Sequence, residues 1–223
     1  MKPSYAGVVF DVYGTLLDVA SIGAEAERLR PGQGAKIAAL WREKQIDGTR
    51  LRTLAGRFAD FWSVTADALG FVDEALRLGL GGAETESLLA RYAVLCAHPD
   101  ALPALKALRA KGLRLGVLSN AGAPMLRRAL DAAALTPLLD HVLSAESVKK
   151  FKVAPEAYAI GPEAFGAPAQ ALLFVSSNAW DVAGAAWFGY DTFWVNRSGA
   201  PFERLGVQPT AAGPSLAELA AAL

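Results

Sequence analysis

The sequence predicts an α/β fold: a doubly wound parallel sheet, with a helical domain inserted after its first strand. From residue 99 onward, short apolar runs alternate with helical stretches, which is typical of parallel strands covered on both faces. Residues 18–97 show helical periodicity instead and lack strand-like runs. We therefore assign residues 1–17 and 98–223 to a Rossmann-like core and residues 18–97 to a helical cap.

The elements of the core can be followed along the chain. Strands are expected at residues 8–10, 113–118, 139–144, 171–175 and 192–195. Helices are expected at 101–110, near Pro124, from Pro155, at 179–188 and in the alanine-rich tail after Pro214. Because crossovers between parallel strands are right-handed, these elements form one sheet with helices on both faces.

The composition restricts the class of protein. The chain has 223 residues with 22 basic and 22 acidic side chains, so no charge excess favours nucleic acid. The single cysteine, Cys96, excludes an internal disulfide and fits a reducing compartment. Signal-peptide and membrane-length apolar runs are not found. We expect a cytoplasmic protein that binds neither nucleic acid nor a membrane.

Asp11 directly follows the first strand and begins a tight turn that contains Tyr13 and Gly14. A carboxylate is unfavourable to bury at the tip of a strand, so it usually serves chemistry or caps the turn. A phosphate-handling version of this motif would need a second carboxylate where Tyr13 stands. These observations favour an aspartate nucleophile that works without a metal.

Polar side chains follow four of the expected strands. In an open parallel sheet, the carboxyl ends of the strands meet at one edge, where ligands bind. Taken singly, each residue also has a structural explanation as a turn residue, a helix cap or a solvated lysine. Their coincidence at one edge favours a catalytic site. The residues are Asp11, Thr15, Ser119, Asn120, Lys152, Ser176, Asn178 and Asp181.

Several segments together carry a family resemblance. They are Phe10–Leu16, Trp41–Gln45, Leu118–Asn120, Ser147–Lys152 with Pro155 and Tyr158, Phe174–Asp181, Phe188–Tyr190 and Trp194–Arg197. With them the chain resembles the haloacid dehalogenase superfamily, and within it the hydrolytic L-2-haloacid dehalogenases. The motif Asp-x-x-Gly-Thr alone would indicate only the superfamily, whereas the combination is specific for this group.

The resemblance implies a catalytic role for each strand-end residue. Asp11 would attack the halogen-bearing carbon and form an ester, while Lys152 keeps the Asp11 carboxylate ionised. Asp181 would then take the proton from the water that attacks this ester. The residues implied to hold these groups by hydrogen bonds are Thr15, Ser176 and Asn178.

The resemblance also implies donors for the two anionic groups of the reaction. The halide would lie against Arg42, Asn120 and the ring of Phe61, and a guanidinium suits this task because it stays charged at any working pH. The substrate carboxylate would lie against Ser119 and nearby backbone amides. The other residues expected at the substrate site are Val12, Tyr13, Tyr158 and Trp180. No metal or organic cofactor is expected.

The activity implied is hydrolysis of a short 2-haloalkanoic acid to the 2-hydroxy acid and halide, with inversion at the reacting carbon. A Mg²⁺-dependent phosphatase of the same superfamily is the main alternative, but Tyr13 and the serines at 176 and 177 make a poor magnesium cage. A non-catalytic binding descendant would have lost Asp11 or Lys152, and both are present. Relatives are often dimers, and the apolar cap helices could supply the contact of a homodimer, while the sequence leaves the oligomeric state open.

One departure from the group leaves the substrate range open. Relatives commonly carry aromatic residues soon after the pair that corresponds to Lys44 and Gln45, whereas this chain has Gly48 and Arg50 there. We expect this difference to remove side-chain bulk close to the pocket. The preferred halogen, the release of fluoride, the chain length of the substrate and the stereochemical strictness are therefore not predicted.

Overall fold

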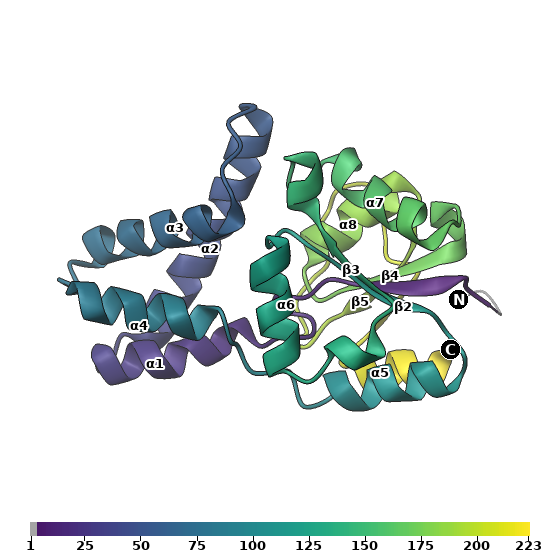
Figure 1. The fold of residues 1–223 in the computed structure, drawn as a ribbon, viewed down its shortest axis with the longest axis horizontal. Helices are drawn as coiled ribbons and strands as arrows, with labels where there is room; N and C mark the ends of the chain where they lie inside the picture. Colours follow the sequence, from purple (N-terminus) through teal and green to yellow (C-terminus); the bar gives the residue numbers. More distant parts are fainter. Residues whose placement is uncertain (1–3) are drawn as a thin grey trace.

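The computed structural model describes residues 4–223, and a six-stranded parallel sheet forms its centre (Figure 1). The strands lie in the order β3-β2-β1-β4-β5-β6, and every neighbouring pair is parallel. Their bounds are β1 (Gly7–Phe10), β2 (Leu115–Ser119), β3 (His141–Ser144), β4 (Leu172–Ser176), β5 (Asp191–Val195) and β6 (Ala211–Gly213). This confirms the doubly wound sheet, whose strand order reverses between β1 and β4, where such folds bind ligands.

Helices cover both faces of this sheet. Helices α5 and α9 pack together on one face, and α7 and α8 lie on the other (Figure 1). The bounds are α5 (Ala101–Ala110), α6 (Ala123–Ala132), α7 (Pro155–Phe165), α8 (Ala179–Phe188) and α9 (Leu216–Ala222). All five helices were expected, whereas β6 was not, because its Ala-Ala-Gly sequence lacks the apolar β-branched residues that indicate a strand.

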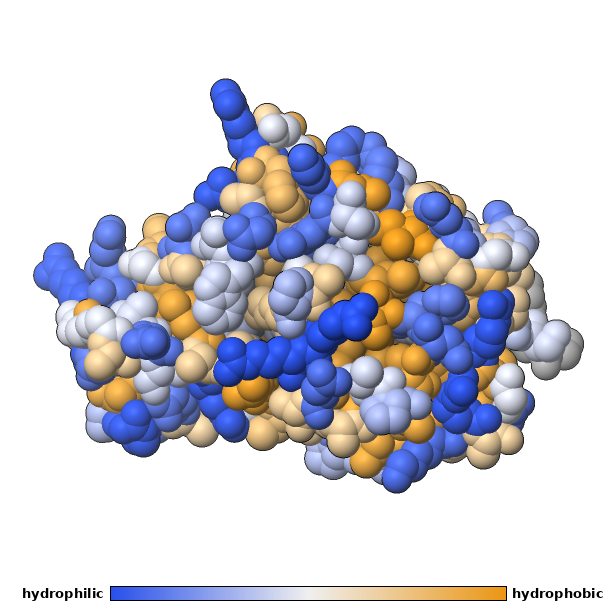
Figure 2. Space-filling view, viewed as in Figure 1, coloured by the Kyte–Doolittle hydropathy of each residue, from blue (hydrophilic) through white to orange (hydrophobic). Residues whose placement is uncertain are grey.

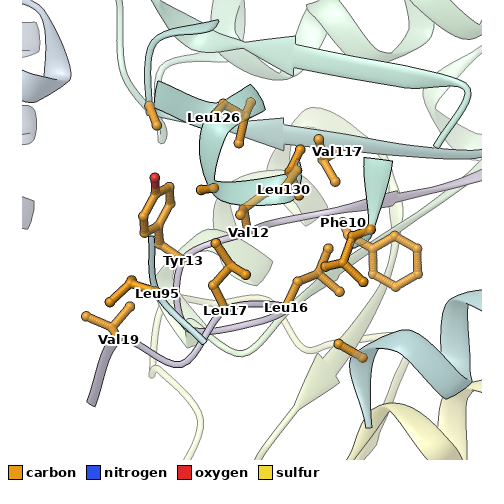
Figure 3. Packing of buried hydrophobic residues seen from close by; sticks show 14 of the residues in the cluster. Phe10, Val12, Tyr13, Leu16, Leu17, Val19, Leu95, Val117, Leu126 and Leu130 are labelled. Atoms are coloured by element: carbon orange, nitrogen blue, oxygen red, sulfur yellow. The ribbon is translucent and has the colours of Figure 1, made fainter. Parts of the chain in front are cut away.

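The core of the sheet consists of one hydrophobic cluster on each face. Successive residues of a strand point to opposite faces, so Val8 and Phe10 of β1 join one cluster and Val9 joins the other. Figure 3 shows the first cluster, in which the turn after β1 packs against α6. The labelled residues there are Phe10, Val12, Tyr13, Leu16, Leu17, Val19, Leu95, Val117, Leu126 and Leu130. The turn that carries Asp11 is thus anchored by buried apolar side chains.

Four helices form a separate part beside the sheet (Figure 1). They are α1 (Ile22–Leu29), α2 (Gly34–Leu54), α3 (Phe61–Leu76) and α4 (Gly82–Tyr92). Asp60 caps the amino end of α3, where its carboxylate accepts a hydrogen bond from the Ser63 backbone N–H. The buried side chains between these helices include Ile37, Trp41, Val64, Leu69, Val72, Leu88 and Tyr92.

The chain passes between the two parts twice, and the two passes lie side by side. Leu17 and Ala97 form an antiparallel bridge, and the backbone N–H of Asp18 donates to the carbonyl of Cys96 at 2.8 Å. The backbone N–H of His98 donates to the carbonyl of Leu16 at 2.9 Å. We propose that the cap begins and ends at this bridge, at residues 18 and 97.

Within residues 4–223, no helix combines the length and the hydropathy that crossing a bilayer requires. Figure 2 shows hydrophobic residues interspersed with hydrophilic ones over both parts of the visible face.

Candidate active site

Asp11 lies at the carboxyl end of β1, where its backbone N–H still donates to Val175 of β4 at 2.9 Å. After it the chain turns sharply, and the backbone N–H groups of Leu16 and Leu17 both donate to the carbonyl of Val12 at 2.9 Å. Gly14 adopts a φ of +95° in this turn, a conformation that side chains with a Cβ rarely tolerate. The strand and the turn together hold Asp11 at the edge of the sheet.

The carboxylate of Asp11 accepts hydrogen bonds from four side chains. Its Oδ1 accepts from Lys152 Nζ at 3.1 Å. Its Oδ2 accepts from Thr15 Oγ1 at 2.9 Å, from Asn178 Nδ2 at 2.9 Å and, more weakly, from Ser176 Oγ at 3.4 Å. The structure thus brings together all of the predicted partners of Asp11.

Lys152 joins the two carboxylates of the site. Its Nζ donates to Asp11 at 3.1 Å and to Asp181 at 3.0 Å, and it lies 4.9 Å from the centre of the Phe174 ring. Its side chain is only 1% exposed. Burial alone would lower the pKa of Lys152, but the charges of Asp11 and Asp181 outweigh burial and raise it. Lys152 is therefore an ammonium ion with two acidic partners.

Asp181 lies in the first turn of α8 and is fully buried. Its Oδ1 accepts a hydrogen bond from Tyr158 Oη at 2.7 Å, and its Oδ2 accepts the bond from Lys152. Burial raises the pKa of Asp181 to about 6, although Lys152 and Tyr158 act in the opposite direction. A carboxylate with a raised pKa is a better proton acceptor near neutral pH than an ordinary aspartate.

Ser177 has a positioning role that the sequence did not indicate. Its backbone N–H donates to Thr15 Oγ1 at 2.8 Å, and its Oγ donates to the carbonyl of Gly14 at 2.7 Å. These bonds fix the Thr15 hydroxyl so that it donates to Asp11. In the sequence, only its location between Ser176 and Asn178 indicated that Ser177 belongs to the site.

The cap supplies the opposite wall of the site. A cavity of about 20 Å³ separates this wall from the sheet edge, which is room for about one water molecule. It is lined by Asp11, Tyr13, Arg42, Ile46, Thr49, Phe61, Ser119, Asn120, Lys152 and Trp180. Most of the predicted substrate-site residues therefore surround one small space.

Arg42 is held in this wall by two hydrogen bonds. Its Nη2 donates to the carbonyl of Tyr13 at 3.0 Å, and its Nη1 donates to Gln45 Oε1 at 2.8 Å. Gln45 is fully buried, accepts from Tyr92 Oη at 2.8 Å and donates to Thr65 Oγ1 at 2.6 Å. Sequence reasoning missed Gln45, although its position one turn after Trp41 on the same helix face indicated burial.

The core side of the cavity is shaped by Ser119 and Asn120. Ser119 Oγ accepts from the backbone N–H of Ala121 at 3.1 Å, and Asn120 Oδ1 accepts from the backbone N–H of Lys152 at 2.9 Å. The peptide bond between Lys152 and Val153 is cis. The hydrogen bond from the Lys152 backbone to Asn120 ties the end of β2 to the loop that carries Lys152.

Two residues that were expected to bind substrate lie elsewhere. Val12 is fully buried, and its side chain belongs to the hydrophobic cluster against α6 (Figure 3), because Asp11 takes the position toward the cavity. Tyr158 lies behind Asp181 and bonds to it instead of lining the cavity. Neither side chain lines this cavity, and a role of Val12 or Tyr158 in substrate binding stays a prediction.

The expectation about Gly48 is wrong. A Cβ added at Gly48 would lie 3.0 Å from Val64 Cγ1, so this position faces α3 and not the cavity. The residues of α2 that line the cavity are Arg42, Ile46 and Thr49, which share one helix face. Arg50 lies with its guanidinium 4.9 Å from the centre of the Trp180 ring, so it covers a residue that lines the cavity.

Comparison with known proteins places this geometry in a family. A family model described as haloacid dehalogenase-like hydrolase matches residues 5–189. (S)-2-haloacid dehalogenase H-109 of Pseudomonas putida is 39% identical over 96% of this chain and 95% of its own length.

Solved structures agree with this placement. The crystal structure of the L-2-haloacid dehalogenase RSc1362 is 49% identical, with a TM-score of 0.96 and 98% of each chain covered. The L-2-haloacid dehalogenase from Xanthobacter autotrophicus with chloropropionic acid covalently bound is 35% identical, with a TM-score of 0.90 and 97% of each chain covered. The chain belongs to the haloacid dehalogenase-like hydrolases and, within them, to the family of the (S)-2-haloacid dehalogenases.

Proposed function

We propose that the protein hydrolyses a short (S)-2-haloalkanoic acid to the 2-hydroxy acid and a halide ion through an ester on Asp11. The observation that carries this proposal is the position of Lys152 Nζ, 3.1 Å from Asp11 and 3.0 Å from Asp181, beside the small cavity between cap and sheet edge. The relative with chloropropionic acid covalently bound supports a covalent intermediate.

In the first step, a carboxylate oxygen of Asp11 attacks the halogen-bearing carbon. Oδ2 is held by three donors and Oδ1 by Lys152 alone, so we expect Oδ1 to be the attacking oxygen. A new C–O bond forms as the C–halogen bond breaks, and the halide leaves with the bonding electron pair on the opposite side. The configuration of the carbon inverts.

In the second step, water attacks the carbonyl carbon of the Asp11 ester. Asp181 accepts a proton from this water, and the pKa of Asp181, raised by burial, suits it to that task. The C–O bond between the carbonyl carbon and the former Oδ1 breaks, and this oxygen takes one of the two protons of the attacking water and leaves as the hydroxyl group of the product. The other proton stays on Asp181 until it is released to solvent. Asp11 regains its carboxylate with one oxygen from water, and the substrate carbon is not inverted again.

We propose that the reaction proceeds without a metal. The Lys152 ammonium occupies the space between the two carboxylates, which is where a divalent cation would have to lie. Tyr13 supplies a phenol where a metal site would need a second acid. Within residues 4–223, no group of three or more His, Cys, Asp or Glu side chains is arranged to bind a metal ion. This donor set argues against the phosphatase alternative.

We also propose a cytoplasmic location and a homodimer. The one free, exposed cysteine fits a reducing compartment. Exposed apolar side chains on α2 and α3 are candidates for a contact between two copies, and they include Leu51, Leu54, Trp62 and Phe71. Light scattering of the purified protein tests the assembly.

A single turnover in ¹⁸O-labelled water tests the proposed function. With enzyme in excess over 2-chloropropionate, we expect the label in the peptide that contains Asp11 and unlabelled oxygen in the hydroxy acid. Halide release should persist in EDTA and disappear in Asp11→Asn, because an amide is a poor nucleophile. Label in the product but not in the peptide would exclude the ester, and Mg²⁺-dependent hydrolysis of a phosphate ester would favour the phosphatase.

A further inference from the structure

The hydroxyl of Tyr13 is buried and makes no hydrogen bond to any residue in the described part of the chain. The residue is 2% exposed and lines the cavity beside Asp11. A buried phenol without a partner is unfavourable, and native proteins rarely retain one without a reason. The position therefore calls for an acceptor that arrives with a ligand.

The ring of Tyr13 is fixed by its aromatic neighbours. It stacks on Tyr92 at 5.8 Å between centroids and 13° between planes, and it contacts Phe61 at 5.9 Å. Gln45 Oε1, the acceptor of the neighbouring Tyr92 hydroxyl, already accepts from Tyr92 and Arg42. The ring contacts hold the Tyr13 side chain in place.

The hydroxyl stays a donor under all working conditions. Burial, together with the nearby Tyr92 and Asp11, raises the pKa of Tyr13 well above its usual range, although the Arg42 charge opposes this. The phenol is thus neutral and carries its proton.

Other donors lie around the same cavity. Arg42 donates one bond to Gln45 and one to the carbonyl of Tyr13, and its positive charge lies close enough to act on both Tyr13 and Tyr92. Asn120 accepts with Oδ1, while its amide NH₂ group has no partner within residues 4–223. Donors thus reach the cavity from the turn after β1 (Tyr13), from the cap (Arg42) and from the end of β2 (Asn120), as the cradle of a leaving halide requires.

We propose that the Tyr13 hydroxyl donates a hydrogen bond to the departing halide, beside Arg42, and thereby sets how well the site releases the smaller halogens. This inference rests on the proposed function. Negative charge on the halogen grows as the C–halogen bond breaks, so the bond to Tyr13 is stronger in the transition state than in the bound substrate. A compact halide concentrates this charge, so chloride gains more from the donor than bromide does.

The test is the Tyr13→Phe variant, which deletes the hydroxyl and keeps the ring stack. We expect single-turnover chloride release from chloroacetate to slow by about 10- to 100-fold, the effect of one hydrogen bond to a charged group. Bromide release from bromoacetate should slow clearly less. Inhibition of the wild type by added chloride should weaken in the variant, which measures halide binding without chemistry. The melting temperature should not fall, because the deleted hydroxyl has no partner in the fold.

Tyr5→Phe is the matched control, because it deletes the hydroxyl of another buried tyrosine. Tyr5 precedes β1 at the opposite edge of the sheet, and its hydroxyl donates to Asp191 at 3.0 Å. We expect this control to leave the ratio of chloride to bromide release unchanged. An equal slowing with both halogens in Tyr13→Phe, no slowing at all, or a clearly lower melting temperature would each overturn the inference. A wild type that releases no halide from any 2-haloacid would instead overturn the proposed function.

Discussion

The two walls of the cavity differ in how their polar groups are satisfied. On the sheet side, the charged groups of Asp11, Lys152 and Asp181 all have partners within the protein. On the side next to the cap, the hydroxyl of Tyr13, whose ring contacts Phe61 and Tyr92 of the cap, has none within residues 4–223. The charged groups of the sheet wall are therefore satisfied without a ligand, while the side next to the cap keeps a donor for an anion.

This difference indicates how the two walls contribute to the reaction. Charges that are already oriented need no rearrangement when the nucleophile attacks, so the sheet wall is preorganised. Unpartnered donors gain most when negative charge develops in front of them, which happens only as the halide leaves. The first wall positions the nucleophile, and the second stabilises the leaving group.

Lys152→Met should produce the largest effect, since it removes the only cation of the sheet wall. Two buried carboxylates would then face each other, and loss of one partner from a buried ionic cluster destabilises a protein by about 3–5 kcal/mol. Because Lys152 lowers the pKa of Asp181, its removal raises this pKa further above the unfolded value. The added destabilisation should therefore grow as the pH rises from about 5 to about 8.

Thermal unfolding of Lys152→Met at both pH values checks this prediction. Lys150→Met is the matched control, because Lys150 pairs with Glu156 at the surface and such pairs contribute about 0–1 kcal/mol. If Lys152→Met melts at the same temperature as the control, the charge of Lys152 does not stabilise the fold through Asp11 and Asp181.

The pH dependence of turnover should report the ionisation of Asp181. This residue must be deprotonated to accept a proton, so kcat should fall about tenfold per pH unit below the pKa of about 6. The Tyr158 hydroxyl stabilises the carboxylate and lowers this pKa, so Tyr158→Phe should move the acidic limb to higher pH. Steady-state rates between about pH 4.5 and 8 test both statements. If the acidic limb of the pH–rate profile does not move in Tyr158→Phe, the group that titrates there is not Asp181.

Gln45→Met should give a smaller effect, on the cap wall. It removes the acceptor of Arg42 and Tyr92 but keeps a side chain of similar length. We expect kcat with a chlorinated substrate to fall about tenfold and stability to fall by about 1–3 kcal/mol, since Tyr92 loses its buried partner. The loss should be larger for chloride than for bromide if Gln45 acts through Arg42. Equal losses with both halogens would indicate a purely structural role.

The sheet wall could be predicted from sequence more completely than the cap wall. Parallel strands bring their carboxyl ends to one edge, so the positions of Asp11, Lys152 and Asp181 follow from topology once the strands are recognised. The bounds of α5 and α8 were predicted for the same reason, because their apolar periodicity is clear.

The cap wall depends on contacts that no local pattern reveals. Arg42 and Gly48 lie on the same helix, yet Arg42 faces the cavity and Gly48 faces Val64, a choice made by the packing of α2 on α3. Gln45 reads as an ordinary polar residue until its three partners are in place. The cis bond after Lys152 has no local signal either, since such bonds occur almost only before proline.

The small volume of the cavity has a consequence for the rate of turnover. A space for about one water molecule cannot admit even a haloacetate, so the cap must separate from the sheet edge before each reaction and again before product leaves. Opening breaks the bond of Arg42 to Tyr13, the stacking of Arg50 on Trp180 and the bond of the Phe151 backbone N–H to Thr53. The interactions that keep bulk solvent from the ester must thus break and re-form in each turnover. Their summed strength sets an upper limit on the turnover rate.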